Sequence, residues 1–391
     1  MINVNVEYIN HYLLSGKAKH ILALQSFFGW SRLSIRCLFL YVEADEKADL
    51  TELCAQQGLP VVLRTASFSS PVQATSLAKE TVEPAGISGI ERNERKFMLR
   101  KNALPHRVPT RGMIHHGQSV SLLGQESKGS VGVFLSPSGA KKKIYALTAY
   151  HVLPTHQTNE RRVITPAGLD ISSHLYWAMN DSPPGNEHIA TLLEQQENPC
   201  GVVEYGNIGS NANEWRTDFA VVKLHKEFEG KNGMWHDYKG LKVVCAATED
   251  YHFDSPGTNR ILGARNPMAG EICYKDGATT DLTRGRIGFS EAWMFENEAV
   301  EVATRGSTGI SKTKLLTFHP IKPGDGPVCA EGDSGCALFV SVPEKQGWAW
   351  AGQLVGLMHC EGSGAVGLVV PASQVLGSLR EHTGLSWELT R

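Results

Sequence analysis

The stretch Cys329–Phe339, CAEGDSGCALF, places an Asp-Ser pair between two glycines immediately before an apolar run. A tight turn explains this pattern simply, because glycine adopts backbone conformations that other residues avoid, and Asp and Ser are common turn residues. A nucleophilic serine explains it as well, since two backbone amides of such a turn can face a developing oxyanion. The second interpretation requires a base elsewhere in the chain and a group that orients that base.

The chain carries both groups at strand boundaries. His151 closes the apolar strand YALTAYH, and Asp218 opens the strand DFAVVKL, so that the order along the chain is His, Asp, Ser334. Taken singly, a histidine at a strand end is commonly a structural residue, and an Asp before a strand commonly caps a turn. Taken together, the three residues provide the nucleophile, base and orienting acid that acyl transfer by serine requires.

These stretches resemble the chymotrypsin-like (trypsin-fold) serine peptidases, in particular intracellular or fungal and bacterial members. LTAYHVL is similar to the family's Thr-Ala-x-His segment, TDFAVVKL to its Asp-bearing strand, and EGDSGCALF to its nucleophile loop. VGLMHCEG is similar to the strand beside the primary specificity pocket, and YKDGATTDLTRG to a pattern found in some bacterial and fungal members. The resemblance covers about residues 112 to 385 and leaves the first hundred residues unexplained.

The resemblance implies a role for each residue of the constellation. Ser334 attacks the scissile carbonyl, His151 transfers the proton, and Asp218 holds the imidazole tautomer. The backbone N–H groups of Gly332 and Ser334 form the oxyanion hole. No metal and no cofactor are expected.

The specificity pocket is also implied by the resemblance. Val328 is expected near the pocket floor, which disfavours a preference for Lys or Arg in the substrate. His359 and Cys360 are expected on the pocket strand, where His359 could donate a hydrogen bond to a Glu or Gln side chain of the substrate. The alternative for His359 is a buried structural imidazole.

Other features of this region leave alternatives open. Asp170 and Asp181 lie in the long insertion between His151 and Asp218 and compete for the orienting role, but a strand fixes Asp218 better than a loop fixes either rival. Cys329 could bridge to Cys360, or both could be free buried thiols. Many family members pair a new N-terminus with the Asp that precedes the nucleophile, here Asp333. Cleavage after Arg111 would free such a terminus, but activity without cleavage, or activation through the N-terminal residues, is the preferred expectation.

The chain has three expected parts: a small α/β unit over residues 1–75, a basic linker over 76–111, and a mainly β peptidase domain over 112–391 with two barrels and a C-terminal helix. In the first part, residues 6–16 and 49–58 are expected to be helical, and 34–43 and 60–68 to form strands. The segment after Ser69 is rich in Arg and Lys, which favours a solvated linker over a processing site. In the third part, strands are expected at 119–123, 130–136, 143–149, 218–224, 242–247, 270–275, 336–342, 354–360 and 366–371, and a helix near 371–382.

Composition excludes several classes of function. A net charge of -2 gives no electrostatic case for binding nucleic acid or a membrane surface. The eight cysteines are scattered without a Cys-x-x-Cys pair, which argues against a zinc ribbon or a disulfide scaffold. The first 20 residues lack the pattern of a secretory signal, and no apolar run is long enough for a membrane-spanning helix, so a cytoplasmic location is expected.

The sequence therefore predicts a serine endopeptidase that acts on a protein or peptide substrate. Two other functions remain open. One is a catalytically inactive interaction module with the same fold, and the other is an esterase or amidase that uses the same three residues. The N-terminal unit is expected to be regulatory and could bind a regulatory partner.

Overall fold

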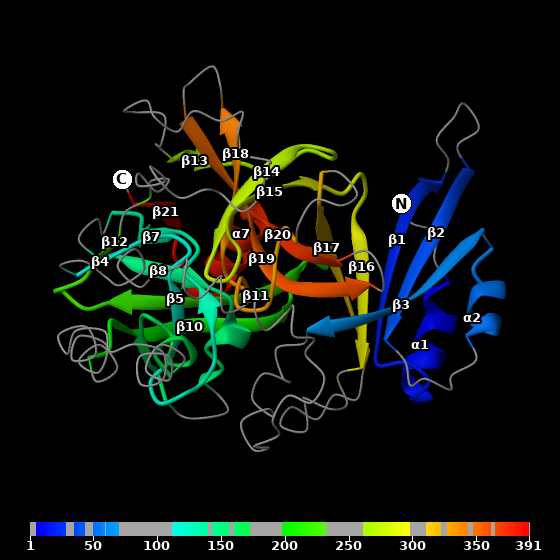
Figure 1. Cartoon of the computed structure of the whole chain (residues 1–391), viewed down its shortest axis with the longest axis horizontal. Helices are drawn as coiled ribbons and strands as arrows, with labels where there is room; N and C mark the ends of the chain where they lie inside the picture. The colour runs from blue at the N-terminus through cyan, green and yellow to red at the C-terminus, as the bar shows by residue number, and fades with distance from the viewer. Residues whose placement is uncertain are drawn as a thin grey trace, which may run out of the picture.

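The computed structural model describes residues 5–28, 35–43, 50–58, 60–69, 112–139, 143–155, 160–172, 198–230, 232, 261–297, 310–321, 327–342, 347–360 and 364–390. Strands dominate these residues, as Figure 1 shows, and a long helix lies near the C-terminus. The mainly β class and the C-terminal helix, α7 (Ala372–Thr383), are confirmed. In the described part of the chain, no helix has the length and apolar character needed to cross a membrane.

The first half of residues 112–391 folds into a curled sheet of eight strands in the order β21-β7-β8-β11-β10-β9-β5-β6. Strand β5 pairs with β6, and the chain continues directly from β6 into β7, which pairs with β8. This continuous segment therefore links β5 to β8, and the sheet curls back on itself. Two short strands, β12 and β4, pair separately. The bounds are β4 (Met113–Ile114), β5 (Ser119–Leu122), β6 (Gly129–Ser130), β7 (Phe134–Pro137), β8 (Tyr145–Thr148), β9 (Arg162–Ile164), β10 (Gly201–Ser210), β11 (Arg216–Leu224), β12 (Glu229–Gly230) and β21 (Trp387–Leu389).

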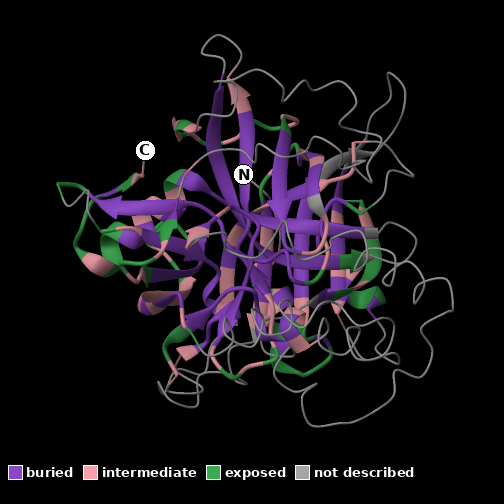
Figure 2. Cartoon of the chain, turned by 60° about the vertical axis from the view of Figure 1, so that its left-hand side comes forward, coloured by how far each residue is buried: buried purple, intermediate pink, exposed green. Residues whose placement is uncertain are grey.

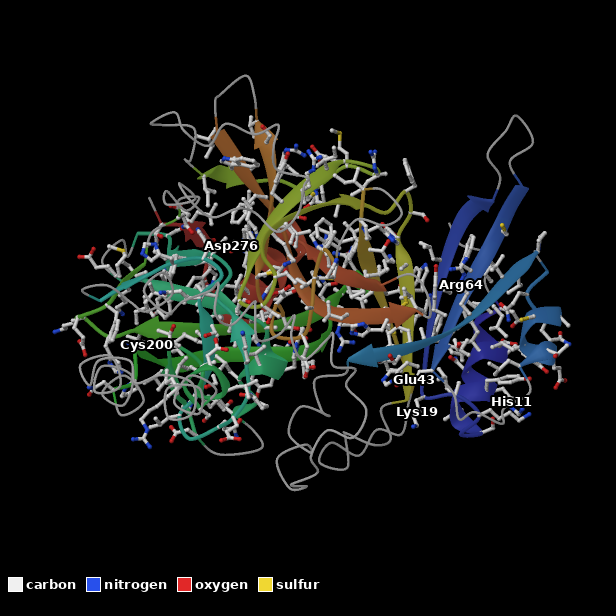
Figure 3. The ribbon with its side chains drawn as sticks, in the orientation of Figure 1. His11, Lys19, Glu43, Arg64, Cys200 and Asp276 are labelled. Atoms are coloured by element: carbon white, nitrogen blue, oxygen red, sulfur yellow. The ribbon has the colours of Figure 1, made fainter. Side chains whose placement is uncertain are left out.

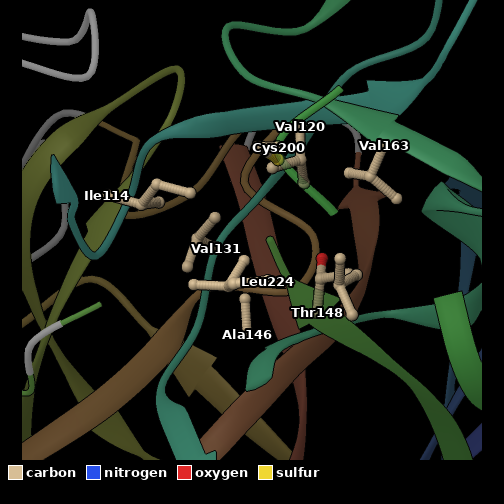
Figure 4. A pocket seen from close by; sticks show the side chains of 9 residues that line it. Ile114, Val120, Val131, Ala146, Thr148, Val163, Cys200 and Leu224 are labelled. Atoms are coloured by element: carbon tan, nitrogen blue, oxygen red, sulfur yellow. The ribbon is translucent and has the colours of Figure 1, made fainter. Parts of the chain in front are cut away.

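Small and branched side chains fill the inside of this ring. Figure 4 shows the apolar cavity that remains there, about 10 Å³ in volume and lined by residues such as Val120, Ala146 and Cys200. A space of this size holds at most one water, so it is a packing defect and not a ligand site. The side chains packed inside this ring form a core that fixes the ends of the surrounding strands.

The second half of the region forms another ring. Strands β14, β15, β17, β20, β19 and β18 each pair with the next, and β18 returns to β14. Most residues of these strands are buried, and Figure 2 shows buried strands crossing at the centre of the molecule. The bounds are β13 (Ile261–Ala264), β14 (Ile272–Gly277), β15 (Asp281–Ile287), β16 (Ala292–Asn297), β17 (Ile310–His319), β18 (Ala337–Val342), β19 (Gly347–Cys360) and β20 (Gly364–Pro371).

The N-terminal residues contain the predicted α/β elements and one strand that the sequence did not predict. The elements are α1 (Val6–Leu14), β1 (His20–Phe28), β2 (Ile35–Glu43), α2 (Thr51–Ala55) and β3 (Val61–Ser69), of which β1 is the unpredicted strand. Their shared core includes Ile9, Leu40, Leu53 and, from β16, Phe295. The core of this unit is therefore extended by β16, which lies in the part of the chain after residue 112.

Sheet pairing joins this N-terminal unit to the rest of the chain in two places. Strand β1 pairs antiparallel with β16, and β3 pairs antiparallel with β19. Figure 1 shows β3 reaching from the N-terminal unit toward the centre of the molecule. The whole predicted linker (residues 76–111) and the predicted strand at 242–247 lie outside the described residues.

Candidate active site

His151 and Asp218 come together because their strands are neighbours. Strands β8 and β11 pair antiparallel with Thr148 opposite Ala220, which brings the end of β8 beside the start of β11. The chain leaves β8 through a short 3₁₀ turn, η4 (Tyr150–Val152), that carries His151. Its Nδ1 lies 2.7 Å from Oδ2 of Asp218. The other carboxylate oxygen, Oδ1, accepts hydrogen bonds from the backbone N–H groups of Tyr150 (2.8 Å) and His151 (3.1 Å).

The Asp218 side chain is completely buried. Burial alone would raise its pKa, but the neighbouring His151, the hydrogen bond to it and the Arg216 guanidinium outweigh burial, and the pKa lies below its ordinary value. The carboxylate is therefore ionised at neutral pH. It holds a proton on Nδ1 of His151, which leaves Nε2 to accept a proton from another group.

Ser334 lies on a loop whose shape depends on two glycines. Gly332 and Gly335 both have φ of +92°, a conformation that side chains disfavour. A Cβ at Gly335 would stand 2.2 Å from Oγ1 of Thr148 and 2.9 Å from the backbone N of Ala149. Gly335 thus lies in close contact with the segment that leads to His151, and only glycine fits at this position.

Ser130, at the end of β6, ties the two segments together. Its N–H donates to the carbonyl of Ser334 (2.8 Å), its hydroxyl donates to the carbonyl of Gly332 (2.8 Å), and its own carbonyl accepts from Oγ1 of Thr148 (2.8 Å). These bonds connect the Ser334 loop to the strand that precedes His151. Among the described residues, no hydrogen bond joins Nε2 of His151 to Oγ of Ser334; such bonds are often long before substrate binds.

The backbone amides of the loop divide into two groups. The N–H of Asp333 donates to the carbonyl of Ala330 (3.0 Å), and that of Gly335 donates to the carbonyl of Leu354 (2.8 Å). The N–H groups of Gly332 and Ser334 donate to no backbone acceptor in the described part of the chain. These are the two amides that the sequence predicts for an oxyanion hole, and they remain available to a ligand.

A buried ion pair lies directly beneath the loop. Nζ of Lys275, on β14, lies 2.8 Å from Oδ2 of Asp333, and both side chains are completely buried. The Thr280 hydroxyl donates to Oδ2 (2.6 Å), and the N–H groups of Thr279 (2.9 Å) and Ala330 (2.9 Å) also donate to this carboxylate. Burial would raise the pKa of Asp333, but Lys275 and these hydrogen bonds lower it below its ordinary value. The Lys275 ammonium is therefore already the cationic partner of the Asp333 carboxylate.

The structure resolves several alternatives that the sequence left open. Asp170 pairs with Nζ of Lys128 (2.9 Å), so it is engaged away from His151, whereas Asp181 lies outside the described residues. Cys329 is a free, buried thiol whose sulfur contacts the carbonyl of Ala365 (3.8 Å), which excludes the bridge to Cys360 in this structure. Burial raises the pKa of the Cys329 thiol to about 12, so it is not a nucleophile.

The predicted pocket residues lie in two different environments. Val328 is 1% exposed and packs in the second ring with Phe318 and Leu354. His359 is exposed, so the alternative of a buried imidazole at this position is wrong. Cys360 is described only through its backbone pairing in β19. Val328 and His359 line neither the cavity inside the first ring nor the two cavities beside the N-terminal strands, and their roles stay predictions.

Comparisons with known proteins give only distant similarities. No family model matches the chain, and no curated protein does. Solved structures that it resembles include Protease A of Thermobifida fusca (16% identity, TM-score 0.38), a glutamic acid specific serine protease described as using a histidine triad in substrate binding (17%, 0.39), and Nocardiopsis protease (15%, 0.39). Each match covers 71% of this chain and 100% of the other. Similarities this weak do not decide the activity, which has to be inferred from the geometry of the chain.

Sequence patterns did not reveal the residues that support the loop. Lys275 lies 58 positions before Asp333, and Ser130 lies 202 positions before Gly332, so no local motif links either residue to its partner. One signal was present for Lys275: it is a charged residue within the strand ICYKDG, whose neighbours are otherwise suited to burial. A buried lysine requires an anionic partner, which makes Asp333 a natural candidate.

Proposed function

We propose that this chain is a chymotrypsin-like serine endopeptidase that cleaves peptide bonds through an acyl-enzyme on Ser334. The observation that carries the proposal is the 2.7 Å hydrogen bond between His151 and the buried Asp218, located beside a glycine-framed Ser334 loop with two free backbone amides. A turn without catalytic function needs neither the oriented imidazole nor the free amides.

Each group has a defined role in this reaction. His151 takes the proton of the Ser334 hydroxyl at Nε2 while the oxygen attacks the scissile carbonyl, and the N–H groups of Gly332 and Ser334 stabilise the oxyanion. The imidazolium then gives its proton to the leaving amine, which departs and leaves the acyl-enzyme. A water molecule releases the acyl group by the same steps. Asp218 keeps the imidazole in one tautomer and stabilises its charged form.

The Lys275–Asp333 pair supports activity without a newly cleaved N-terminus. In the sequence resemblance, Asp333 would accept an N-terminal ammonium, but here the Lys275 ammonium lies 2.8 Å from it. The Asp333 carboxylate in turn accepts hydrogen bonds from the N–H groups of Thr279 and Ala330 and so fixes the loop before Ser334. Cleavage after Arg111 is therefore not needed to order the loop.

Two further parts of the proposal concern substrate and location. The exposed His359 on β19 could donate a hydrogen bond to a Glu or Gln side chain of the substrate. Six cysteines, Cys37, Cys54, Cys200, Cys273, Cys329 and Cys336, are free thiols, which supports a reducing, intracellular environment.

Cleavage profiling with a peptide library tests the proposal, with Ser334→Ala and Asp218→Asn as controls. We expect cleavage by the wild-type protein that disappears in Ser334→Ala. Cleavage after Lys or Arg would contradict the pocket assignment, whereas cleavage after Glu or Gln would support His359. Turnover of small esters without any peptide cleavage would favour an esterase, and no turnover of either substrate class would favour an inactive module.

A further inference from the structure

Strand β3 divides its pairing between two different parts of the molecule. Its first half, Val61–Thr65, pairs parallel with β2 inside the N-terminal unit. Its second half, Ala66–Ser69, leaves that sheet and pairs antiparallel with β19, with Ser67 opposite His359 and Ala66 opposite Cys360. The second half thus contributes backbone pairing to the peptidase region and not to its own unit.

The segment of β19 that β3 covers lies close to the nucleophile loop. Leu354 of β19 exchanges backbone hydrogen bonds with this loop, accepting from Gly335 (2.8 Å) and donating to Cys336 (3.0 Å). The pairing with β3 begins three residues further along, where Leu357 faces Ser69. At about 3.3 Å per residue, this point is about 10 Å along the strand from the loop.

The opposite edge of this segment is already occupied. Strand β20 pairs with β19 from Gly352 to Cys360, so only the edge that β3 covers remains for another strand. An extended peptide binds to a sheet by adding a strand to a free edge through main-chain hydrogen bonds. A peptide that binds across Ser334 in this way would need the edge that β3 holds.

Side chains anchor β3 on this edge. Phe68 is 5% exposed and contacts the His20 ring, with 5.7 Å between ring centroids. The cavity beside it is about 20 Å³ and is lined also by Met294, Leu315 and Leu368 of the peptidase region, so the ring of Phe68 nearly fills the space. A bulky aromatic anchor of this kind stabilises docking through the apolar area it buries.

Polar contacts add a second anchor at the same junction. Nδ1 of His20 lies 2.5 Å from Glu43, and its Nε2 lies 3.9 Å from Glu296 of β16. Glu296 also pairs with Arg216 of β11, two residues before Asp218. Figure 3 labels Glu43 where the N-terminal sheet meets β16. The N-terminal unit is thus attached next to the strand that carries Asp218.

We propose that Ala66–Ser69 occupy the strand edge on which an extended substrate binds, so that the N-terminal unit inhibits this site from within the same chain. The inference rests on the proposed peptidase function. A substrate must displace this half of β3, or the unit must be released first. The occupant is a strand of this chain, and it competes at the high effective concentration of a tethered segment, on the order of millimolar.

Proline substitutions in β3 test the proposal while leaving the proposed catalytic residues unchanged. Neighbouring residues of a strand point their N–H groups in opposite directions, so one of Ala66 and Ser67 donates toward β19. We would compare Ala66→Pro and Ser67→Pro with Ser67→Ala, which keeps the backbone intact. Phe68→Ala removes the aromatic anchor without altering the backbone.

Two readouts separate this inference from the proposed function. A small fluorophosphonate probe reports on Ser334 without needing a strand edge, and a fluorogenic peptide of eight residues requires the edge. At about 10 µM peptide against a tethered strand of about 1 mM, release of β3 should speed peptide cleavage by up to about a hundredfold. Probe labelling should change little, and Ser67→Ala should behave as the wild-type protein does.

Each outcome decides one question. Faster peptide cleavage by a proline variant or by Phe68→Ala, at equal probe labelling, supports the inhibitory strand. Equal peptide cleavage in all variants that label normally overturns it and leaves the peptidase proposal intact. If a proline variant no longer reacts with the probe, the comparison of peptide cleavage between Phe68→Ala and the wild-type protein decides the question. If no protein labels, the wild-type chain included, the proposed function fails and this inference fails with it.

Discussion

Replacing Lys275 by Met should destabilise the protein and impair the Ser334 loop. At 2.8 Å, the attraction between Lys275 and Asp333 is about 6 kcal/mol for an effective dielectric constant of about 20. Losing one partner of a buried pair costs about 3–5 kcal/mol, because the other charge is left uncompensated. Asp333 would keep its hydrogen bonds from Thr280 and from backbone amides, so we expect the lower value, about 3 kcal/mol.

The effect should depend on pH in a defined direction. The folded-state pKa of Asp333 is lowered, so its contribution to stability is present above the unfolded pKa of about 3.9 and is lost as the pH falls through the folded value. Burial lowers the pKa of Lys275, but Asp333 outweighs it and raises that pKa; this contribution is lost only as the pH rises through the folded value, above about 10.4. The difference between wild type and Lys275→Met should therefore be largest between about pH 4 and 10 and shrink in acid.

Chemical denaturation at pH 7 and at about pH 3 or below measures this difference, and fluorophosphonate labelling of Ser334 reports on the loop. A loss of about 3 kcal/mol corresponds to about 6–12 °C in melting temperature for a domain of ordinary size. The double variant Lys275→Met/Asp333→Asn serves as the control and should recover most of the stability, because it leaves no unpaired charge. Unchanged stability and labelling in Lys275→Met would refute the role given to this ion pair.

Three further predictions follow from the geometry. Asp218→Asn should lower kcat for peptide cleavage by about 10⁴ with little change in KM, because the imidazole loses its tautomer; a loss below tenfold would argue against the role of Asp218. Gly332→Ala should reduce kcat a hundredfold or more, which is about the effect of losing one oxyanion donor, because the added Cβ would lie 2.6 Å from Thr279 and displace the loop. The control is Gly384→Ala, which has a similar φ and open space around it and should leave kcat unchanged. Burial lowers the pKa of His116 to about 4, so stability should fall by up to roughly 3 kcal/mol between about pH 6.5 and 4, and His116→Phe should flatten that slope in acid unfolding curves.

Local sequence patterns were enough to select His151, Asp218 and Ser334 as candidates, because each lies in a short motif at a strand boundary. His151 follows a strand whose apolar residues are evident, and Asp218 lies near the start of another, so their approach needs only that β8 and β11 pair. The glycines around Ser334 also have a local signature, since each needs a positive φ. These features depend on the chain within a few residues.

Features that depend on distant pairing could not be predicted in this way. Strand β1 was missed because its apolar run is equally compatible with a buried helix segment. The pairing of Ala66–Ser69 with β19 joins segments almost 300 positions apart, and neither segment contains a pattern that predicts the other as its partner. The same limit applies to Lys275 and Ser130, whose roles depend on which strands lie next to the nucleophile loop.

The most direct test of the central claim is to map where a fluorophosphonate probe reacts, by tandem mass spectrometry of the labelled wild-type protein. We predict covalent modification of Ser334 that is lost in Ser334→Ala and strongly reduced in His151→Ala. Labelling of another serine, or labelling of Ser334 that does not depend on His151, would contradict the assignment of this site as a serine peptidase centre.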